Sequence, residues 1–108
     1  MVIRQVIITD LALDELHSEI LYHRLNTSEV FASTMKIEFM KKVDSILLNP
    51  YIYPECRFLP TKTQIYRNII WGNYLIIYRI KKDVIEVLSF FHAKQKPSKI
   101  RLVTRKKK

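Results

Sequence analysis

Three apolar runs separated by short polar breaks predict three adjacent strands in the second half of the chain. The runs are QIYRNIIW, YLIIYRI and VIEVLSFF, between residues 64 and 91, with short polar breaks at residues 72–73 and 81–83. Runs of branched and aromatic residues joined by tight turns are typical of an antiparallel meander. Both faces of the middle run are largely apolar, so we expect the chain's own helices to cover one face and a partner the other.

The first half of the chain predicts one strand and then an amphipathic helix. Residues 2 to 8 are rich in Val and Ile and favour a strand. Thr9 or Asp10 can then cap a helix over about residues 10 to 24, in which Leu13, Leu16 and Ile20 share one face.

A second, longer helix follows within a few residues. Asn26 is its expected cap, because Glu29 three positions later can bond back to it. An apolar stripe then continues for about five turns, until Asn49-Pro50, where proline disfavours a further helical residue. The short connection makes the two helices a hairpin. We therefore predict an α+β fold of order β-α-α-β-β-β, with the helix hairpin packed on an antiparallel sheet.

The length of 108 residues leaves room for one core. We expect a single domain over residues 1–104 and a frayed basic tail over residues 105–108. The apolar runs are far shorter than the roughly 18 residues of a membrane span, and no secretory signal opens the sequence, so we expect a cytoplasmic protein with no membrane partner. One cysteine and three widely spaced histidines predict no disulfide and no metal site, and we expect no cofactor.

Charge divides the chain into two unlike halves. Residues 1–56 carry five Lys and Arg against eight Asp and Glu, whereas residues 57–108 carry fourteen against two. The halves therefore have formal charges of −3 and +12 within a total of +9. This asymmetry favours a polyanionic partner, either a nucleic acid or an acidic protein segment, while a solvated basic tail is the simpler alternative.

Four short motifs occur in a fixed order along the chain. They are LLNPYIYPE at residues 47–55, YRNI at 66–69, YLIIYRI at 74–80 and IEVLSFFH at 85–92. Together with the order of elements, they resemble the RelE/ParE superfamily of toxins from bacterial type II toxin–antitoxin systems, also known as plasmid stabilisation proteins. The resemblance implies a small basic toxin that inhibits growth and is neutralised by a cognate antitoxin through an acidic or amphipathic segment.

The resemblance implies two possible targets, because RelE-like members cleave messenger RNA in the ribosome and ParE-like members poison DNA gyrase. A metal-independent ribonuclease needs a base, an acid and cations close together, and the candidates here are Arg67, His92 and Lys94. The RelE set is incomplete, since Leu75 stands where those enzymes have a cation and no tyrosine follows Tyr78. We therefore favour a ParE-like gyrase poison, which would not be an enzyme. The alternatives are a ribosome-dependent mRNA endonuclease and an inactive nucleic-acid or protein-binding module.

Candidates for antitoxin contact come from the strands and the basic tail. They are Trp71, Arg79, Lys96 and Arg101. Trp71 is expected to be exposed at a turn, and Arg79 can pair with an antitoxin carboxylate. Structural roles are the alternative: an arginine in a strand can pack its stem with its head in solvent, and His92 can bond a backbone group where the chain leaves the sheet.

Overall fold

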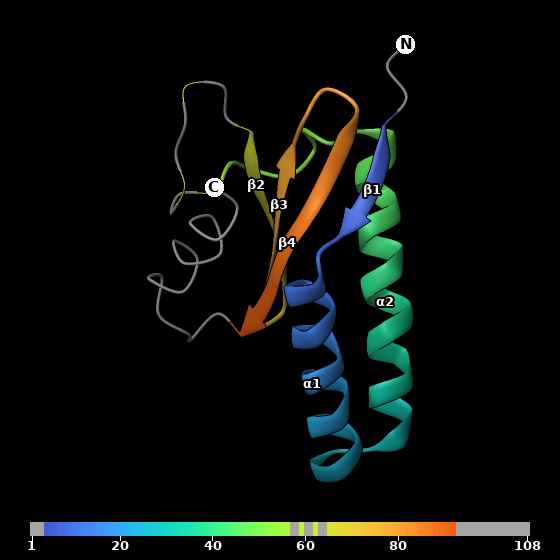
Figure 1. Ribbon diagram of the computed structural model, residues 1–108. Helices are drawn as coiled ribbons and strands as arrows, with labels where there is room; N and C mark the ends of the chain where they lie inside the picture. Colours follow the sequence, from blue (N-terminus) through green and yellow to red (C-terminus); the bar gives the residue numbers. More distant parts are fainter. Residues whose placement is uncertain (1–3, 57–58, 60–61, 63–64, 93–108) are drawn as a thin grey trace.

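In the part of the chain that the structure describes, a helix hairpin packs on a four-stranded sheet (Figure 1). The computed structural model describes residues 4–56, 59, 62 and 65–92. The elements are β1 (Gln5–Ile8), α1 (Asp10–Asn26), α2 (Glu29–Leu48), β2 (Tyr66–Trp71), β3 (Tyr74–Ile80) and β4 (Val84–His92). The predicted order of elements is therefore confirmed. The far end of the hairpin extends beyond the sheet (Figure 1).

Helix α1 begins at the first of the two predicted caps. The hydroxyl of Thr9 accepts a hydrogen bond from the backbone N of Ala12 at 3.2 Å. The side chains that α1 buries are Ala12, Leu16 and Ile20, one turn apart, while Leu13 is only half-buried. This spacing places one face of α1 against the sheet.

Helix α2 begins two residues later than the sequence indicates. Ser28 is its cap, since the Ser28 hydroxyl accepts from the backbone N of Phe31 at 2.9 Å. The prediction of Asn26 as the cap is wrong, because Asn26 is the last residue of α1 and its side chain donates to the carbonyl of Tyr22 at 2.9 Å. The apolar face of α1 stops before its last turn, which explains the error. The end of α2 before Asn49 is as predicted.

The sheet has the strand order β1-β4-β3-β2. The three later strands form the predicted antiparallel meander, with Gly72 at the turn in the left-handed region at φ 57°. Strand β1 pairs with β4 in parallel, so the sheet is mixed and not wholly antiparallel. The helix hairpin carries the chain away from the sheet and back to the end where β1 begins (Figure 1). Strand β2 therefore runs in the direction of β1, β3 runs against it, and β4 again runs with β1.

Each face of the sheet has its own core. On one face, Leu16 and Phe39 from the helices pack with Tyr78 and other sheet residues. On the other face, Cys56 from the loop after α2 packs with Ile77 and further strand residues. The expectation that a partner alone would cover this second face is therefore corrected, since the chain's own loop covers part of it.

A β-bulge in β4 decides which of its side chains face the helices. Val87 and Phe90 both belong to the core on the helix side, although strict alternation would put them on opposite faces. The register between β3 and β4 shifts by one residue, which leaves Leu88 as the extra residue of β4. The bulge therefore also places His92 on the helix side of the sheet, opposite Tyr74.

Thr9 connects this bulge to the start of α1. Its backbone N donates to the carbonyl of Val87 at 3.0 Å, and its hydroxyl donates to the carbonyl of Leu88 at 3.1 Å. Farther along α1, the Oε1 atom of Glu15 accepts from the backbone N of Phe90 at 3.0 Å. The first half of β4 thus lies beside β1, and its second half lies beside α1.

Shortening Leu16 to alanine should lower the free energy of unfolding far more than shortening Leu48. Leu16 is 2% exposed in the core, whereas Leu48 is 92% exposed at the end of α2. We expect Leu16→Ala to lower the free energy of unfolding by about 3 kcal/mol through the cavity it leaves, and Leu48→Ala to change it by less than about 0.5 kcal/mol. Urea unfolding of both variants measures the difference, and equal losses would contradict this packing.

Alanine substitutions at the two candidate caps of α2 should distinguish them. Ser28→Ala removes the bond to the backbone N of Phe31 and should lower the free energy of unfolding by about 1 kcal/mol. Asn26→Ala removes only an exposed bond at the end of α1 and should cost less than half as much. Thermal unfolding followed by circular dichroism measures both variants; a larger loss for Asn26→Ala would refute the assignment of Ser28.

Candidate functional site

Arg67 on β2 fixes the loop that follows α2. Its Nη1 atom donates to the carbonyl of Tyr53 at 2.9 Å, and its guanidinium lies 5.0 Å from the ring centre of Tyr51. Tyr78 of β3 also holds this loop, because its hydroxyl donates to the carbonyl of Pro50 at 2.7 Å. Burial raises the pKa of Tyr78, so this hydroxyl remains a donor. Arg67 therefore has a structural role in the chain itself.

His92 ends β4 at the other end of the sheet. It pairs with Tyr74 of β3, and the two rings meet edge to face at 5.4 Å. Arg67 pairs with Tyr78 of the same strand, four positions away. Four positions along a strand span about 13 Å, and β2 and β4 flank β3 on opposite sides. The structure thus does not bring Arg67 and His92 together around one phosphate.

A polar network beside His92 was not foreseen from the sequence. The hydroxyl of Tyr74 donates to Oε1 of Glu19 at 2.6 Å and lies 2.8 Å from Nε2 of His23. Since the tyrosine proton is directed at Glu19, Nε2 of His23 must carry a proton and donate. Nδ1 of His23 lies 3.1 Å from the hydroxyl of Thr27. Glu19 and His23 are four apart in α1, a spacing that could have revealed their shared face.

Burial raises the pKa of Tyr74 well above its ordinary value, and the hydrogen bond to Glu19 raises it further. The phenol therefore remains protonated at neutral pH and acts as a donor. It cannot serve as a base there. The network links α1 to β3, and its tyrosine adds no general base to the candidate nuclease set.

Trp71 at the end of β2 is half-buried, so the expectation of an exposed anchor is wrong. Its ring lies 5.9 Å from that of Phe90 and 6.1 Å from that of Tyr74, between ring centres. Nζ of Lys42 lies 5.5 Å from the Trp71 ring centre. Packing against α2 and β4 buries this residue because Trp71 points to the helix side of the sheet.

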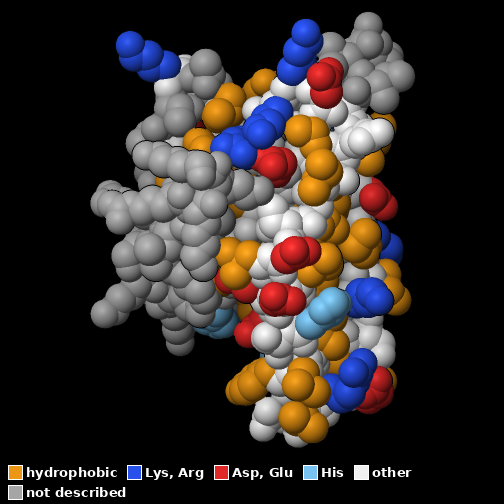
Figure 2. Space-filling view, viewed as in Figure 1, with side chains coloured by type: hydrophobic (Ala, Val, Ile, Leu, Met, Phe, Trp, Pro, Cys, Tyr) orange, Lys and Arg blue, Asp and Glu red, His pale blue; other side chains and the backbone are white. Residues whose placement is uncertain are grey.

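Exposed apolar side chains gather on the helix hairpin, including its tip beyond the sheet (Figure 2). Leu25 of α1 and Val30 of α2 are 73% and 77% exposed on either side of the turn between the helices. Other members of this surface are Leu21, Tyr22, Phe31 and Ile37. We call these six residues the hairpin surface. Exposed apolar side chains gathered in this way commonly mark a site of protein interaction.

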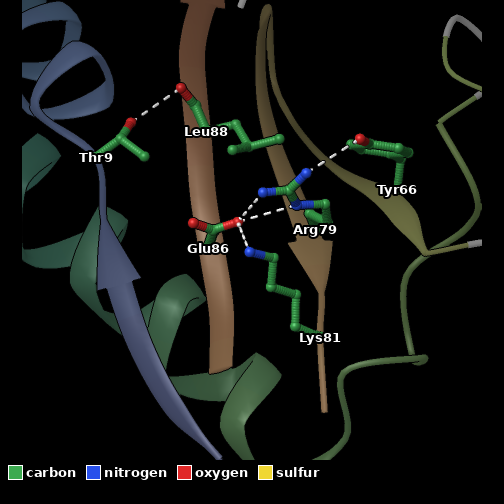
Figure 3. Close-up of polar contacts among 6 residues, drawn as sticks. All are labelled: Thr9, Tyr66, Arg79, Lys81, Glu86 and Leu88. Atoms are coloured by element: carbon green, nitrogen blue, oxygen red, sulfur yellow. Dashed lines mark hydrogen bonds and ion pairs between the residues drawn. The ribbon is translucent and has the colours of Figure 1, made fainter. Parts of the chain in front are cut away.

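Arg79 on β3 lies between Tyr66 of β2 and Glu86 of β4 in the strand register. It forms an ion pair with Glu86, which Lys81 also approaches at 3.5 Å, and its Nη1 atom donates to the hydroxyl of Tyr66 at 3.4 Å (Figure 3). Burial alone would lower the pKa of Arg79, but the hydrogen bonds and the charge of Glu86 outweigh it and raise that pKa. The guanidinium is thus already paired within the chain.

Three predicted residues of the tail, Lys94, Lys96 and Arg101, lie outside the described residues. Within residues 4–56, 59, 62 and 65–92, no cluster of three or more His, Cys, Asp or Glu side chains is arranged to bind a metal. Neither described helix has the length and apolar character needed to span a bilayer.

The sequence model of a protein family, described as the ParE toxin of type II toxin–antitoxin system, parDE, matches residues 6–97. The chain belongs to the ParE toxin family. A solved structure with a similar fold is a chain of the chromosomal ParDE TA system from P. aeruginosa, with a TM-score of 0.70 and 13% sequence identity. The match covers 83% of this chain and 96% of that one. None of the curated proteins compared with the chain matches it.

Membership of the ParE family confirms the resemblance seen in the sequence and the predicted α+β fold. The protein is thus a ParE-like toxin of a type II toxin–antitoxin system, and a cognate antitoxin is its partner. Neither the family match nor the similar structure favours the mRNA endonuclease or the inactive binding module.

Two Glu→Gln substitutions should show how much this ParE-family toxin depends on the ion pair in its sheet. In the Arg79–Glu86 pair the side chains are 16% and 13% exposed, whereas in the Arg24–Glu29 pair they are 47% and 64% exposed. Glu86→Gln should lower the free energy of unfolding by about 2 to 3 kcal/mol, because it leaves a buried charge poorly paired. Glu29→Gln should cost less than about 1 kcal/mol. Urea unfolding tests this, and a Glu86→Gln loss no larger than that of the control would contradict it.

Proposed function

We propose that this ParE-family toxin inhibits DNA gyrase by binding it and does not cleave messenger RNA. The observation that carries the proposal is the separation of Arg67 from His92. Cleavage without a metal needs an acid, a base and a cation around one phosphate, yet Arg67 is engaged with the carbonyl of Tyr53 and His92 lies at the opposite end of the sheet. An inhibitor that acts by binding requires no such convergence.

The hairpin surface is the proposed contact with gyrase. The tip of the hairpin projects beyond the sheet, so a large partner can reach both helices there (Figure 1). Leu25 and Val30 are its most exposed apolar members and lie on opposite sides of one short turn. Burying such side chains against a partner contributes a favourable free energy of about 25 cal/mol per Å² of apolar area removed from water.

The antitoxin is proposed to act by covering the same surface. An amphipathic segment can lay its apolar face on the hairpin surface and fold as it binds. The hairpin itself, residues 10–48, carries seven acidic and four basic side chains, whereas the positive charge lies in the second half of the chain. Acidic residues of the antitoxin would therefore favour that half, and neutralisation would combine apolar cover with charge pairing.

Gyrase inhibition should depend on the tip of the hairpin. In a supercoiling assay with purified protein, the double variant Leu25→Gln with Val30→Gln should need at least about tenfold more protein to inhibit than the unaltered toxin, since about 1.4 kcal/mol of lost contact energy is tenfold in affinity. Leu48→Gln is the matched control, because Leu48 is also a highly exposed leucine of the hairpin but lies at its other end. It should inhibit as the unaltered toxin does.

Two results of the supercoiling assay would overturn the proposal. Absence of gyrase inhibition by the unaltered toxin would exclude the target, and equal weakening in the Leu48→Gln control would exclude the hairpin tip as the contact. Primer extension on a defined message, with ribosomes present or omitted, tests the alternative. Cuts that appear only with ribosomes would establish an endonuclease in place of a gyrase poison.

A further inference from the structure

Two pockets open on either side of Phe31, between the helix hairpin and the turn that joins β2 to β3. One has a volume of about 510 Å³ and lies between α1 and the end of β4. The other has a volume of about 350 Å³ and lies between α2 and the end of β2. Phe31, Asn73 and Tyr74 line both pockets. The two pockets thus share three lining residues, and we call them together the hairpin groove.

Two carboxylates line the part of the hairpin groove that the structure describes. Glu19 lines the first pocket and Glu38 the second, and among the described lining residues none is Lys or Arg, in a chain of formal charge +9. Glu19 accepts a hydrogen bond from the Tyr74 hydroxyl at 2.6 Å. Nζ of Lys41 lies 3.8 Å from Oε1 of Glu38, and an exposed pair of this kind is weak. A carboxylate at each end repels anions and attracts cations.

Aromatic rings form the walls between the two carboxylates. The ring centres of His23 and Phe31 are 4.6 Å apart, and those of Trp71 and Tyr74 are 6.1 Å apart. The faces of such rings attract organic ammonium groups. One ring of the groove already does so within the chain, since Nζ of Lys42 lies 5.5 Å from the Trp71 ring centre.

We propose that the hairpin groove binds a linear aliphatic polyamine. One ammonium group pairs with Glu19 and another with Glu38, while the methylene chain lies over Phe31 and Tyr74. Glu19 and Glu38 lie at similar heights on two antiparallel helices, so about 10 Å separates their backbones. A flexible chain of several methylene groups bridges that length, and a compact inorganic cation does not. This inference is independent of the toxin's target, because it concerns the isolated protein.

Spermidine is the probe that tests the groove. Titrated into the full-length ¹⁵N-labelled protein at low salt and followed by NMR, it should shift the backbone amides of Phe31, Asn73 and Tyr74. The double variant Glu19→Gln with Glu38→Gln should bind spermidine at least about tenfold more weakly. Glutamine at position 19 still accepts the Tyr74 hydroxyl bond, so the fold should be retained, and the dispersion of the NMR spectrum reports on this.

A matched control separates specific binding from general attraction of opposite charges. Asp14→Asn with Asp44→Asn removes the same two charges from exposed positions of α1 and α2 that do not line the groove. Its affinity for spermidine should change by less than about twofold, because exposed charges at a distance are screened. Phe31→Leu, which keeps an apolar side chain and removes the ring, should weaken binding several-fold through the lost cation–π contact. Hexylamine, with a single ammonium group, should also bind at least about tenfold more weakly.

Three outcomes would overturn the polyamine proposal. The first is no spectral change at millimolar spermidine. The second is an equal loss of affinity in the two double variants, which would mean nonspecific attraction. The third is a lysine-rich peptide that binds the same residues more tightly than spermidine, which would assign the groove to a protein side chain. A supercoiling assay in which the toxin failed to inhibit gyrase would leave all these results unaffected.

Discussion

The placement of the helix hairpin on the sheet depends on Thr9. Its hydroxyl accepts from the first turn of α1 and donates to the carbonyl of the bulged Leu88, while its backbone N donates to Val87 (Figure 3 shows the bond to Leu88). One residue therefore ends β1, begins α1 and fixes the irregularity of β4. The edge of β4 lies first beside β1 and then beside α1. Because the Glu15 carboxylate accepts from the backbone N of Phe90, this N–H of β4 keeps a hydrogen-bond partner beyond the end of β1.

The ParE-family fold here separates two kinds of surface. The hairpin presents apolar side chains and a slight excess of acid, whereas the second half of the chain carries the excess positive charge. Residues of the strands that looked like free cations in the sequence are used internally: Arg67 holds the loop after α2, and Arg79 pairs with Glu86. What the described part of the molecule offers to a partner is chiefly the shape and apolar area of two helices.

Local signals made most of the fold predictable. The meander follows from β-rich runs punctuated at Gly72, and the end of α2 follows from Asn49-Pro50, since these signals act within a few residues. The parallel pairing of β1, the burial of Trp71 and the network of Tyr74 could not be predicted, because each depends on contacts between segments distant in the sequence. The same limit applies to the site: residue types nominated Arg67 and His92, but only the register shows how far apart they lie.

The bulge at Leu88 also governs how this chain can be compared with its relatives. A family member that lacks the extra residue would alternate regularly through β4, so matching the two strands without a gap would pair every position after Leu88 with one on the opposite face of the sheet. An ungapped comparison would then equate His92, which faces the helices, with a residue that faces away from them. The length of β4 is thus as informative as its composition, and equivalences near its end are best assigned from strand register.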